Sequence, residues 1–193
     1  PVAFTHGQVA KVFDEAGRGY LDALAGIAVS TLGHAHPRLV RAIADQAGRI
    51  LHTSNIYRIR EQEQLGDRLA ALSGMDEVFL CNSGCEANEA AIKLARKWAA
   101  AQGRAAERRG ILTFRGSFHG RTLAAVTATA QPKYQEGYEP LPPGFAYVDF
   151  NDLAAAEAEL ATGAICAVLV EPVQGEGGVM PATDDFLRGL RAL

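Results

Sequence analysis

The feature that most constrains the fold of this chain is a regular alternation of short apolar runs with helix-periodic segments between residues 78 and 170. Strands are expected at residues 78–81, 111–114, 145–150 and 165–170, and helices at 87–103, from about 121 and at 152–161. Because the alternation repeats, helical crossovers join consecutive strands and produce a mostly parallel sheet with helices on both faces. The sequence therefore predicts an α/β fold, in which ligands collect at the carboxyl ends of the strands.

The part of the chain before residue 78 has a different pattern. A hairpin is expected over residues 8–24, a helix begins at Pro37, and a second helix spans about residues 60–72. We place a domain boundary near residue 52, so that residues 1–52 belong to a smaller α+β domain and residues 53–193 to a larger domain. An amphipathic helix without a stop signal ends the chain, and we expect the larger domain to be incomplete at its C-terminal end.

Composition excludes several classes of protein. With 48% hydrophobic and 21% charged residues and a formal net charge of −3, the chain carries no basic stripe for nucleic acid, and no apolar run approaches the length of a membrane span. Cys81, Cys85 and Cys166 lack metal-ligand spacing and are expected to be reduced, buried thiols of a cytoplasmic protein. His34 and His36 have no acidic or sulfur ligand beside them in the sequence, so no metal site is expected there.

The turn after the first expected strand has the local features of an anion site. Ser83 and Glu86 fit the S-x-x-E capping box, which marks the start of a helix. The N–H groups of Gly84 and Cys85 then lie in the first helical turn, without an intrahelical partner and at the positive end of the helix dipole. Backbone donors in this arrangement are able to bind phosphate. Most strand–turn–helix junctions bind nothing, however, so these local features alone leave the function of the turn open.

Four segments taken in order resemble the class III (ornithine-type) aminotransferases. They are Gly33–Pro37, Asn82–Glu89, Phe118–Thr122 and Glu171–Gly178. This resemblance extends over most of the chain and implies the fold type I of pyridoxal-phosphate-dependent transferases. It implies pyridoxal 5′-phosphate as the cofactor, which carries the chemistry while the protein binds and orients it.

Residue by residue, the resemblance implies cofactor-binding roles for Ser83, Gly84, Cys85 and Phe118. The backbone N–H groups of Gly84 and Cys85 would bind the cofactor phosphate, and the Phe118 ring would lie on the face of the pyridine ring. The family commonly has Ala or Thr where Cys85 stands. Because a backbone donor does not depend on its own side chain, we expect the Cys85 thiol to be passive.

The resemblance also implies substrate-binding roles for Arg121, Glu176, Tyr57 and Asn55. The planar guanidinium of Arg121 would grip a substrate carboxylate with two parallel hydrogen bonds. Glu176 would govern which substrate carboxylate is recognised, by pairing with an arginine beyond residue 193. Tyr57 and Asn55 would line the substrate channel, next to a second subunit.

None of the family's catalytic residues is expected within this chain. The lysine that forms the Schiff base and the aspartate that pairs with the pyridine nitrogen are expected beyond residue 193. The resemblance therefore implies the N-terminal part of an enzyme of arginine biosynthesis, inactive by itself and working in full length as a cytoplasmic homodimer.

The expected reaction transfers the terminal amino group of N2-acetylornithine to 2-oxoglutarate, giving N-acetylglutamate 5-semialdehyde and glutamate. Enzymes that use succinylornithine, ornithine or 4-aminobutyrate share the same segments, so these donors stay open. A non-catalytic chain, either a truncated paralogue or a binding subunit, also stays open because the lysine cannot be located.

Overall fold

The computed structural model describes all residues from 1 to 193, and it divides into two compact units, Pro1–Arg68 and Leu69–Leu193. Each unit is described by itself. The domain boundary expected near residue 52 stays a prediction about the complete fold.

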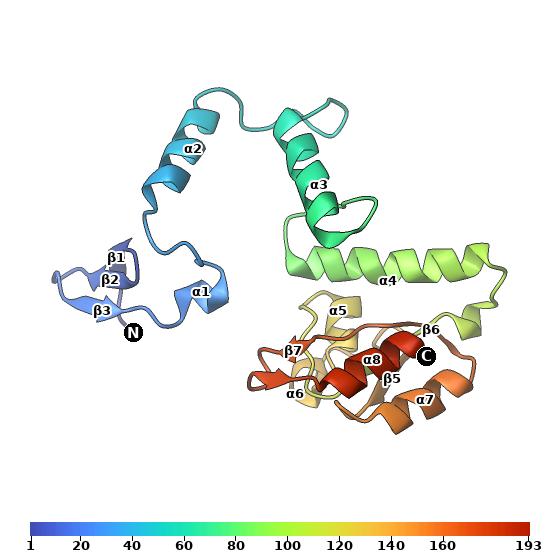
Figure 1. Ribbon diagram of the computed structural model, residues 1–193. Helices are drawn as coiled ribbons and strands as arrows, with labels where there is room; N and C mark the ends of the chain where they lie inside the picture. The colour runs from blue at the N-terminus through green and yellow to red at the C-terminus, as the bar shows by residue number, and fades with distance from the viewer. The chain divides into compact units, whose positions relative to one another are not determined.

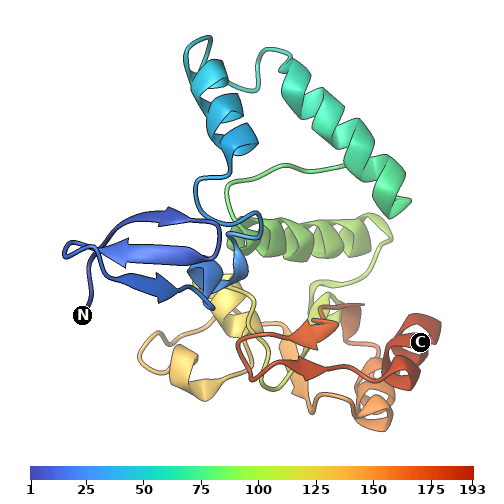
Figure 2. The same ribbon diagram turned by 60° about the vertical axis from the view of Figure 1, so that its left-hand side comes forward.

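The first unit begins with a three-stranded antiparallel sheet (Figure 2), formed by β1 (Phe4–Gln8), β2 (Lys11–Asp14) and β3 (Gly19–Leu21) in that order. The β2–β3 hairpin closes on the carboxylate of Asp14. This carboxylate accepts the N–H groups of Ala16 and Arg18 at 3.0 and 2.9 Å and the phenol of Tyr20 at 3.0 Å. The structure confirms the hairpin predicted over residues 8–24 and adds β1, which the sequence pattern did not indicate.

Helices follow this sheet. They are α1 (Ala25–Ala28), α2 (Pro37–Ala47) and α3 (Arg60–Ser73), the last of which crosses from the first unit into the second. Pro37 is the first residue of α2, where a missing N–H costs nothing. Both helices predicted here are formed. No helix of the chain combines the length and the apolar character needed to cross a membrane.

The second unit is built on a three-stranded parallel sheet. Its strands β4 (Gly110–Phe114), β5 (Phe145–Val148) and β6 (Ile165–Val168) lie in the order β5-β4-β6. Leu112 pairs with Ala146 on one side and Val168 on the other, while Ile111 pairs with Phe145 and Ala167. Neighbouring residues of the central strand therefore face opposite sides of the sheet, and every residue of β4 is buried.

Helices cover both faces of this sheet, as the alternating pattern predicted (Figure 1). On one face Leu112 and Phe114 pack with Ala156 of α7 (Leu153–Ala161) and Phe186 of α8 (Asp184–Ala192). On the other face Ile111 packs with Ile92 of α4 (Gly84–Ala101) and Ala128 of α5 (Leu123–Ala128). The remaining elements of the unit are short: η1 (Ala106–Arg108), α6 (Pro132–Gln135), β7 (Val173–Gln174) and β8 (Met180–Pro181).

One strand prediction is wrong. Residues 78–81 form no strand, and the Phe79 side chain is 71% exposed. A strand requires a hydrogen-bonded neighbour, and no strand of residues 1–193 pairs with this segment. Cys81 is exposed as a consequence and not buried, whereas Cys85 and Cys166 are half-buried; all three thiols are free.

Candidate functional site

The start of α4 offers two unpartnered backbone donors. Ser83 caps the helix, and its hydroxyl accepts the N–H of Glu86 at 3.1 Å. In a capping box the Glu86 carboxylate would accept the backbone N–H of Ser83. Here it accepts the backbone N–H of Asn82 instead, at 2.6 Å. No acceptor faces the N–H groups of Gly84 and Cys85, and the space beside the Gly84 Cα is open for 4 Å. This geometry suits an anion at the helix N-terminus.

The turn that leaves β4 carries Phe118 and is tied to α4. Phe118 is half-buried, and the following residue, His119, is buried. The carbonyl of His119 accepts the side-chain amide of Asn88 at 2.8 Å, and its N–H donates to the Thr129 hydroxyl at 2.8 Å. The first turns of α4 and the Phe118 turn therefore form one hydrogen-bonded assembly.

The loop after β6 joins the same assembly. The Phe118 N–H donates to the Glu171 carboxylate at 2.9 Å, and the buried Gln174 side chain donates to the Arg115 carbonyl at 3.0 Å. Burial raises the pKa of Glu171, while the N–H of Phe118 acts in the opposite direction. The segments that follow β4 and β6 thus meet at the carboxyl ends of the strands, which is where a ligand site is expected in a parallel sheet.

Cys85 lies against the same turn. Its sulfur is 3.4 Å from the Thr122 hydroxyl, which also donates to the Glu89 carboxylate. Burial by itself would raise the pKa of the Cys85 thiol, but hydrogen bonds from Thr122 and Arg121 outweigh it and the net shift is downward. The passive role expected for this thiol stays a prediction.

The guanidinium of Arg121 lies over two aromatic rings. The guanidinium carbon is 5.4 Å from the centroid of Phe118 and 4.3 Å from the centroid of Tyr134. The side chain lines a pocket of about 240 Å³, together with Leu123, Val126, Tyr134 and Tyr138. A cation at one wall and apolar groups at the others suit a ligand with a carboxylate and an apolar body.

Glu176 is an acceptor for three side chains. Its carboxylate accepts the phenol of Tyr134 and the amide of Gln131 at 2.6 Å, and it forms an ion pair with Lys133 at 3.3 Å. These bonds, that of Tyr134 first, lower the pKa of Glu176 to about 2. The sequence analysis named Glu176 but not its partners. These partners lie in residues 131–134, a segment with a proline and an aromatic residue at the start of a loop.

His119 is a second residue that sequence reasoning missed. The side chain is 4% exposed, and its Nε2 atom has no hydrogen-bond partner. Burial lowers its pKa to about 4, so the imidazole is neutral at pH 7. Only its place in the Phe118–Thr122 segment pointed to it.

Asn55 and Tyr57 belong to the first unit, in the segment between α2 and α3. Tyr57 is 68% exposed, and its N–H donates to the Ser54 carbonyl at 3.4 Å. Their place in the substrate channel stays a prediction. The same unit contains a hydrogen bond that the sequence did not suggest: the Nε2 atom of His34 lies 2.6 Å from the carboxylate of Asp22.

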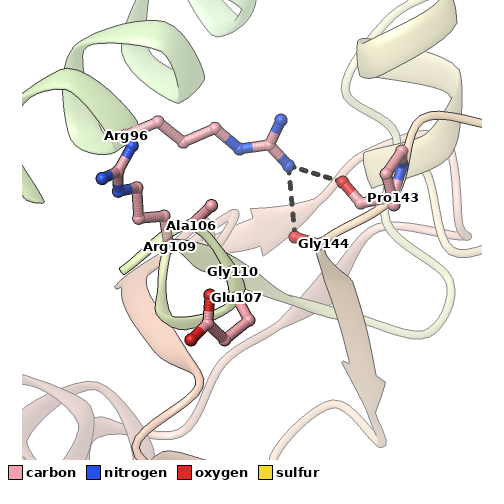
Figure 3. A pocket seen from close by; sticks show the side chains of 7 residues that line it. All are labelled: Arg96, Ala106, Glu107, Arg109, Gly110, Pro143 and Gly144. Carbon is pink, nitrogen blue, oxygen red and sulfur yellow. Dashed lines mark hydrogen bonds between the residues drawn. The ribbon is translucent and has the colours of Figure 1, made fainter. Parts of the chain in front are cut away.

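A larger pocket of about 410 Å³ lies at the opposite ends of the strands (Figure 3). It is lined by Gly110, where β4 begins, and by Gly144, which precedes β5. The Arg96 guanidinium donates to the carbonyls of Pro143 and Gly144 at 2.9 and 3.3 Å. Because ligands of parallel sheets gather at the carboxyl ends, the Gly84–Arg121 region is the stronger candidate.

Comparison with known proteins points to the same family that the four sequence segments resemble. The model of the family described as aminotransferase class-III matches residues 1–193. An acetylornithine aminotransferase of Xanthomonas axonopodis pv. citri (strain 306) is 63% identical over 193 residues, which are 100% of this chain and 47% of that protein.

Solved structures agree with this match. The crystal structure of N-acetylornithine aminotransferase from Stenotrophomonas maltophilia K279a superposes with a TM-score of 0.84 at 46% identity, covering 99% of this chain and 47% of that one. The ornithine aminotransferase from Toxoplasma gondii ME49 superposes with a TM-score of 0.95 at 33% identity, covering 100% and 46%. The predicted fold type I is thereby confirmed, and the chain spans about half the length of the relatives that it matches.

Proposed function

The chain belongs to the class-III aminotransferases, and we propose that it is part of an enzyme that moves the terminal amino group of N2-acetylornithine to 2-oxoglutarate. The products are N-acetylglutamate 5-semialdehyde and glutamate. One observation supports this proposal above the others: the unpartnered N–H groups of Gly84 and Cys85 open beside the turn that carries Phe118 and Arg121. The 63% identity to an acetylornithine aminotransferase supports the choice of donor.

The residues at this place fit pyridoxal phosphate, the cofactor that the family uses. A phosphate dianion matches two free N–H donors at a helix N-terminus, and Gly84 has no side chain to obstruct it. Phe118 supplies a half-buried aromatic surface next to these donors. When bound, the cofactor supplies the electron sink that makes the carbon–hydrogen bond beside the substrate nitrogen acidic.

The chain's own side chains hold and orient the donor. Arg121 would take the substrate carboxylate with a planar fork of N–H donors, which fixes the direction of the substrate chain. The apolar walls at Leu123 and Val126 would exclude water from the methylene groups. We assign the proton-transferring lysine to a part of the enzyme outside residues 1–193, and we propose a homodimer as the working form.

A proline substitution in the full-length protein tests the phosphate site. Gly84→Pro removes one N–H at the first position of α4, where proline suits the helix, and Ser83 before it is already extended at φ −159° and ψ 160°. Losing one charge-assisted bond should weaken cofactor binding on the order of tenfold to a hundredfold, measured by absorbance titration. Asp184→Pro is the matched control, because it places proline at the first position of α8. An unchanged cofactor affinity in a folded Gly84→Pro variant would contradict the assignment.

The donor is tested by steady-state kinetics. The enzyme should turn over N2-acetylornithine with a higher kcat/KM than N2-succinylornithine, ornithine or 4-aminobutyrate, with glutamate formation as the readout. A clear preference for ornithine or 4-aminobutyrate would show that the substrate choice is wrong. Absence of turnover with every donor would reject the enzyme and favour a non-catalytic chain.

A further inference from the structure

The conformation of Arg121 is set by a corner of two aromatic rings. Phe118 and Tyr134 meet edge to face, with centroids 5.9 Å apart and planes at 79°. The Arg121 guanidinium lies over both rings, nearer to Tyr134 at 4.3 Å than to Phe118 at 5.4 Å. A guanidinium on an aromatic face is attracted by the ring quadrupole, so Tyr134 provides the closer of the two contacts.

Tyr134 is itself held in place at its phenol end. The hydroxyl donates to the Glu176 carboxylate. Gln131 also donates from its amide to Glu176 at 2.6 Å and to the Ser117 carbonyl at 2.9 Å, which ties the group to the turn before Phe118. With its pKa near 2, Glu176 remains an ionised acceptor across the working range of an enzyme.

The backbone of Tyr134 is fixed as well. It lies in the short helix α6, which begins at Pro132. The next residue, Gln135, donates from its side-chain amide to the carbonyls of Val126, Thr127 and Thr129 at 3.3, 3.0 and 2.9 Å. These carbonyls belong to α5 and its end, and Arg121 lies just before α5. The tyrosine ring and the arginine are thus carried by elements bonded to each other.

We propose that Tyr134 is a positioning residue that presents the Arg121 guanidinium to the substrate carboxylate, and that Glu176 acts on substrate recognition through Tyr134. This inference rests on the proposed function only in taking a carboxylate as the ligand of Arg121. An exposed arginine loses rotamer freedom when it grips an anion. A side chain already held in its binding conformation has less to lose, which strengthens binding without adding a contact to the ligand.

Binding of a carboxylate probe tests this role without requiring turnover. N-acetylnorvaline carries the acylated amine and the carboxylate but lacks the reacting amine, and N-butylacetamide also lacks the carboxylate. With the cofactor-loaded full-length protein in a calorimeter, Tyr134→Leu should weaken N-acetylnorvaline binding on the order of tenfold. Tyr134→Phe, which keeps the ring and loses the Glu176 bond, should weaken it by roughly threefold. N-butylacetamide lacks the group that Arg121 would bind, so its affinity should change by less than about twofold in Tyr134→Phe, which keeps the aromatic wall of the pocket.

Tyr20 supplies the matched control. Its phenol also donates to a carboxylate, that of Asp14 at 3.0 Å, and its ring meets Phe4 edge-on at 5.5 Å. Tyr20→Leu and Tyr20→Phe should leave the affinity for N-acetylnorvaline within about twofold. In turnover assays Tyr134→Leu should raise KM for the acetylated donor by a similar factor as it weakens the probe, with kcat within about twofold, because only binding is affected.

A double-mutant cycle separates positioning from general disruption. In an Arg121→Gln background, Tyr134→Leu should cost less than twofold further, because its effect passes through the arginine. Equal losses in both backgrounds, an unchanged affinity in Tyr134→Leu, or a wild-type protein that fails to bind N-acetylnorvaline would overturn the inference. A wild-type protein that binds the probe more tightly than Tyr134→Leu does, yet turns over no donor, would sustain the positioning role and reject the proposed function.

Discussion

Gly120 joins the candidate phosphate site to the Phe118 turn, and a single added methyl group should disturb both. Its φ is +135°, a conformation that side chains rarely adopt. A Cβ at this position would lie 2.5 Å from the sulfur of Cys85 and 3.0 Å from the Cβ atoms of Cys85 and Ala125. Two of these atoms are attached directly to helical backbone, and Ala125 is completely buried, so the neighbours have little room to move.

The expected cost of Gly120→Ala has two parts. Holding a non-glycine residue at this φ costs about 1–3 kcal/mol. Forcing a methyl group against packed neighbours costs about 1–3 kcal/mol more. The total of roughly 2–6 kcal/mol should lower the melting temperature of the full-length protein by about 2–12 °C, at about 1–2 °C per kcal/mol, because the relatives of this chain are about twice its length.

Thermal unfolding of the full-length protein measures this cost, with cofactor affinity as a second readout. Gly103→Ala is the control: Gly103 also has a positive φ, +76°, but no atom lies within 4 Å of its added Cβ, so it reports the backbone part alone. Adding Cys85→Ala to Gly120→Ala removes the nearest obstructing atom and should recover part of the loss. If Gly120→Ala costs no more than Gly103→Ala, the packing argument is refuted.

Three further predictions concern stability and are measured by urea unfolding. Phe186→Ala, which empties a side chain that is 2% exposed between α7 and the sheet, should cost about 3–5 kcal/mol; a loss below 1 kcal/mol would contradict the core assignment. Ser83→Ala removes the cap on the Glu86 N–H and should cost about 1 kcal/mol, most of which Ser83→Thr should retain. Because the pKa of buried His119 is about 4, the unfolded chain takes up a proton near pH 6.5 while the folded chain does not. Stability should therefore be complete above pH 6.5 and fall by roughly 1.4 kcal/mol per pH unit down to about pH 4, and His119→Gln should flatten this dependence. Equal slopes for wild type and variant would exclude His119 as the cause.

The sequence predicted local structure correctly where that structure depends on residues close together in the chain. The start of α4 at the Ser83 cap, the Pro37 start of α2 and the hairpin around Asp14 each depend on residues within a few positions of one another. Residues 78–81 were mispredicted because an apolar run states only that a segment can be a strand. Whether it becomes one depends on a neighbouring strand, which the run itself does not encode.

The candidate site divides in the same way. Gly84, Cys85, Phe118 and Arg121 were predicted as site residues because each lies in a short segment that resembles the family. The contacts of Tyr134 and Glu171 were not found. The phenol of Tyr134 reaches a carboxylate 42 residues away, and Glu171 accepts the N–H of Phe118 from 53 residues away.

The amino-acid sequence by itself determined the alternating α/β architecture, the helix starts and the family, because periodicity, capping residues and short segments are properties of neighbours along the chain. Only the tertiary structure decided which side chains surround Arg121 and where the buried His119 and Gln174 lie. Crossovers between parallel strands bring together loops that are far apart in sequence, and the partners they provide follow from the path of the backbone in space.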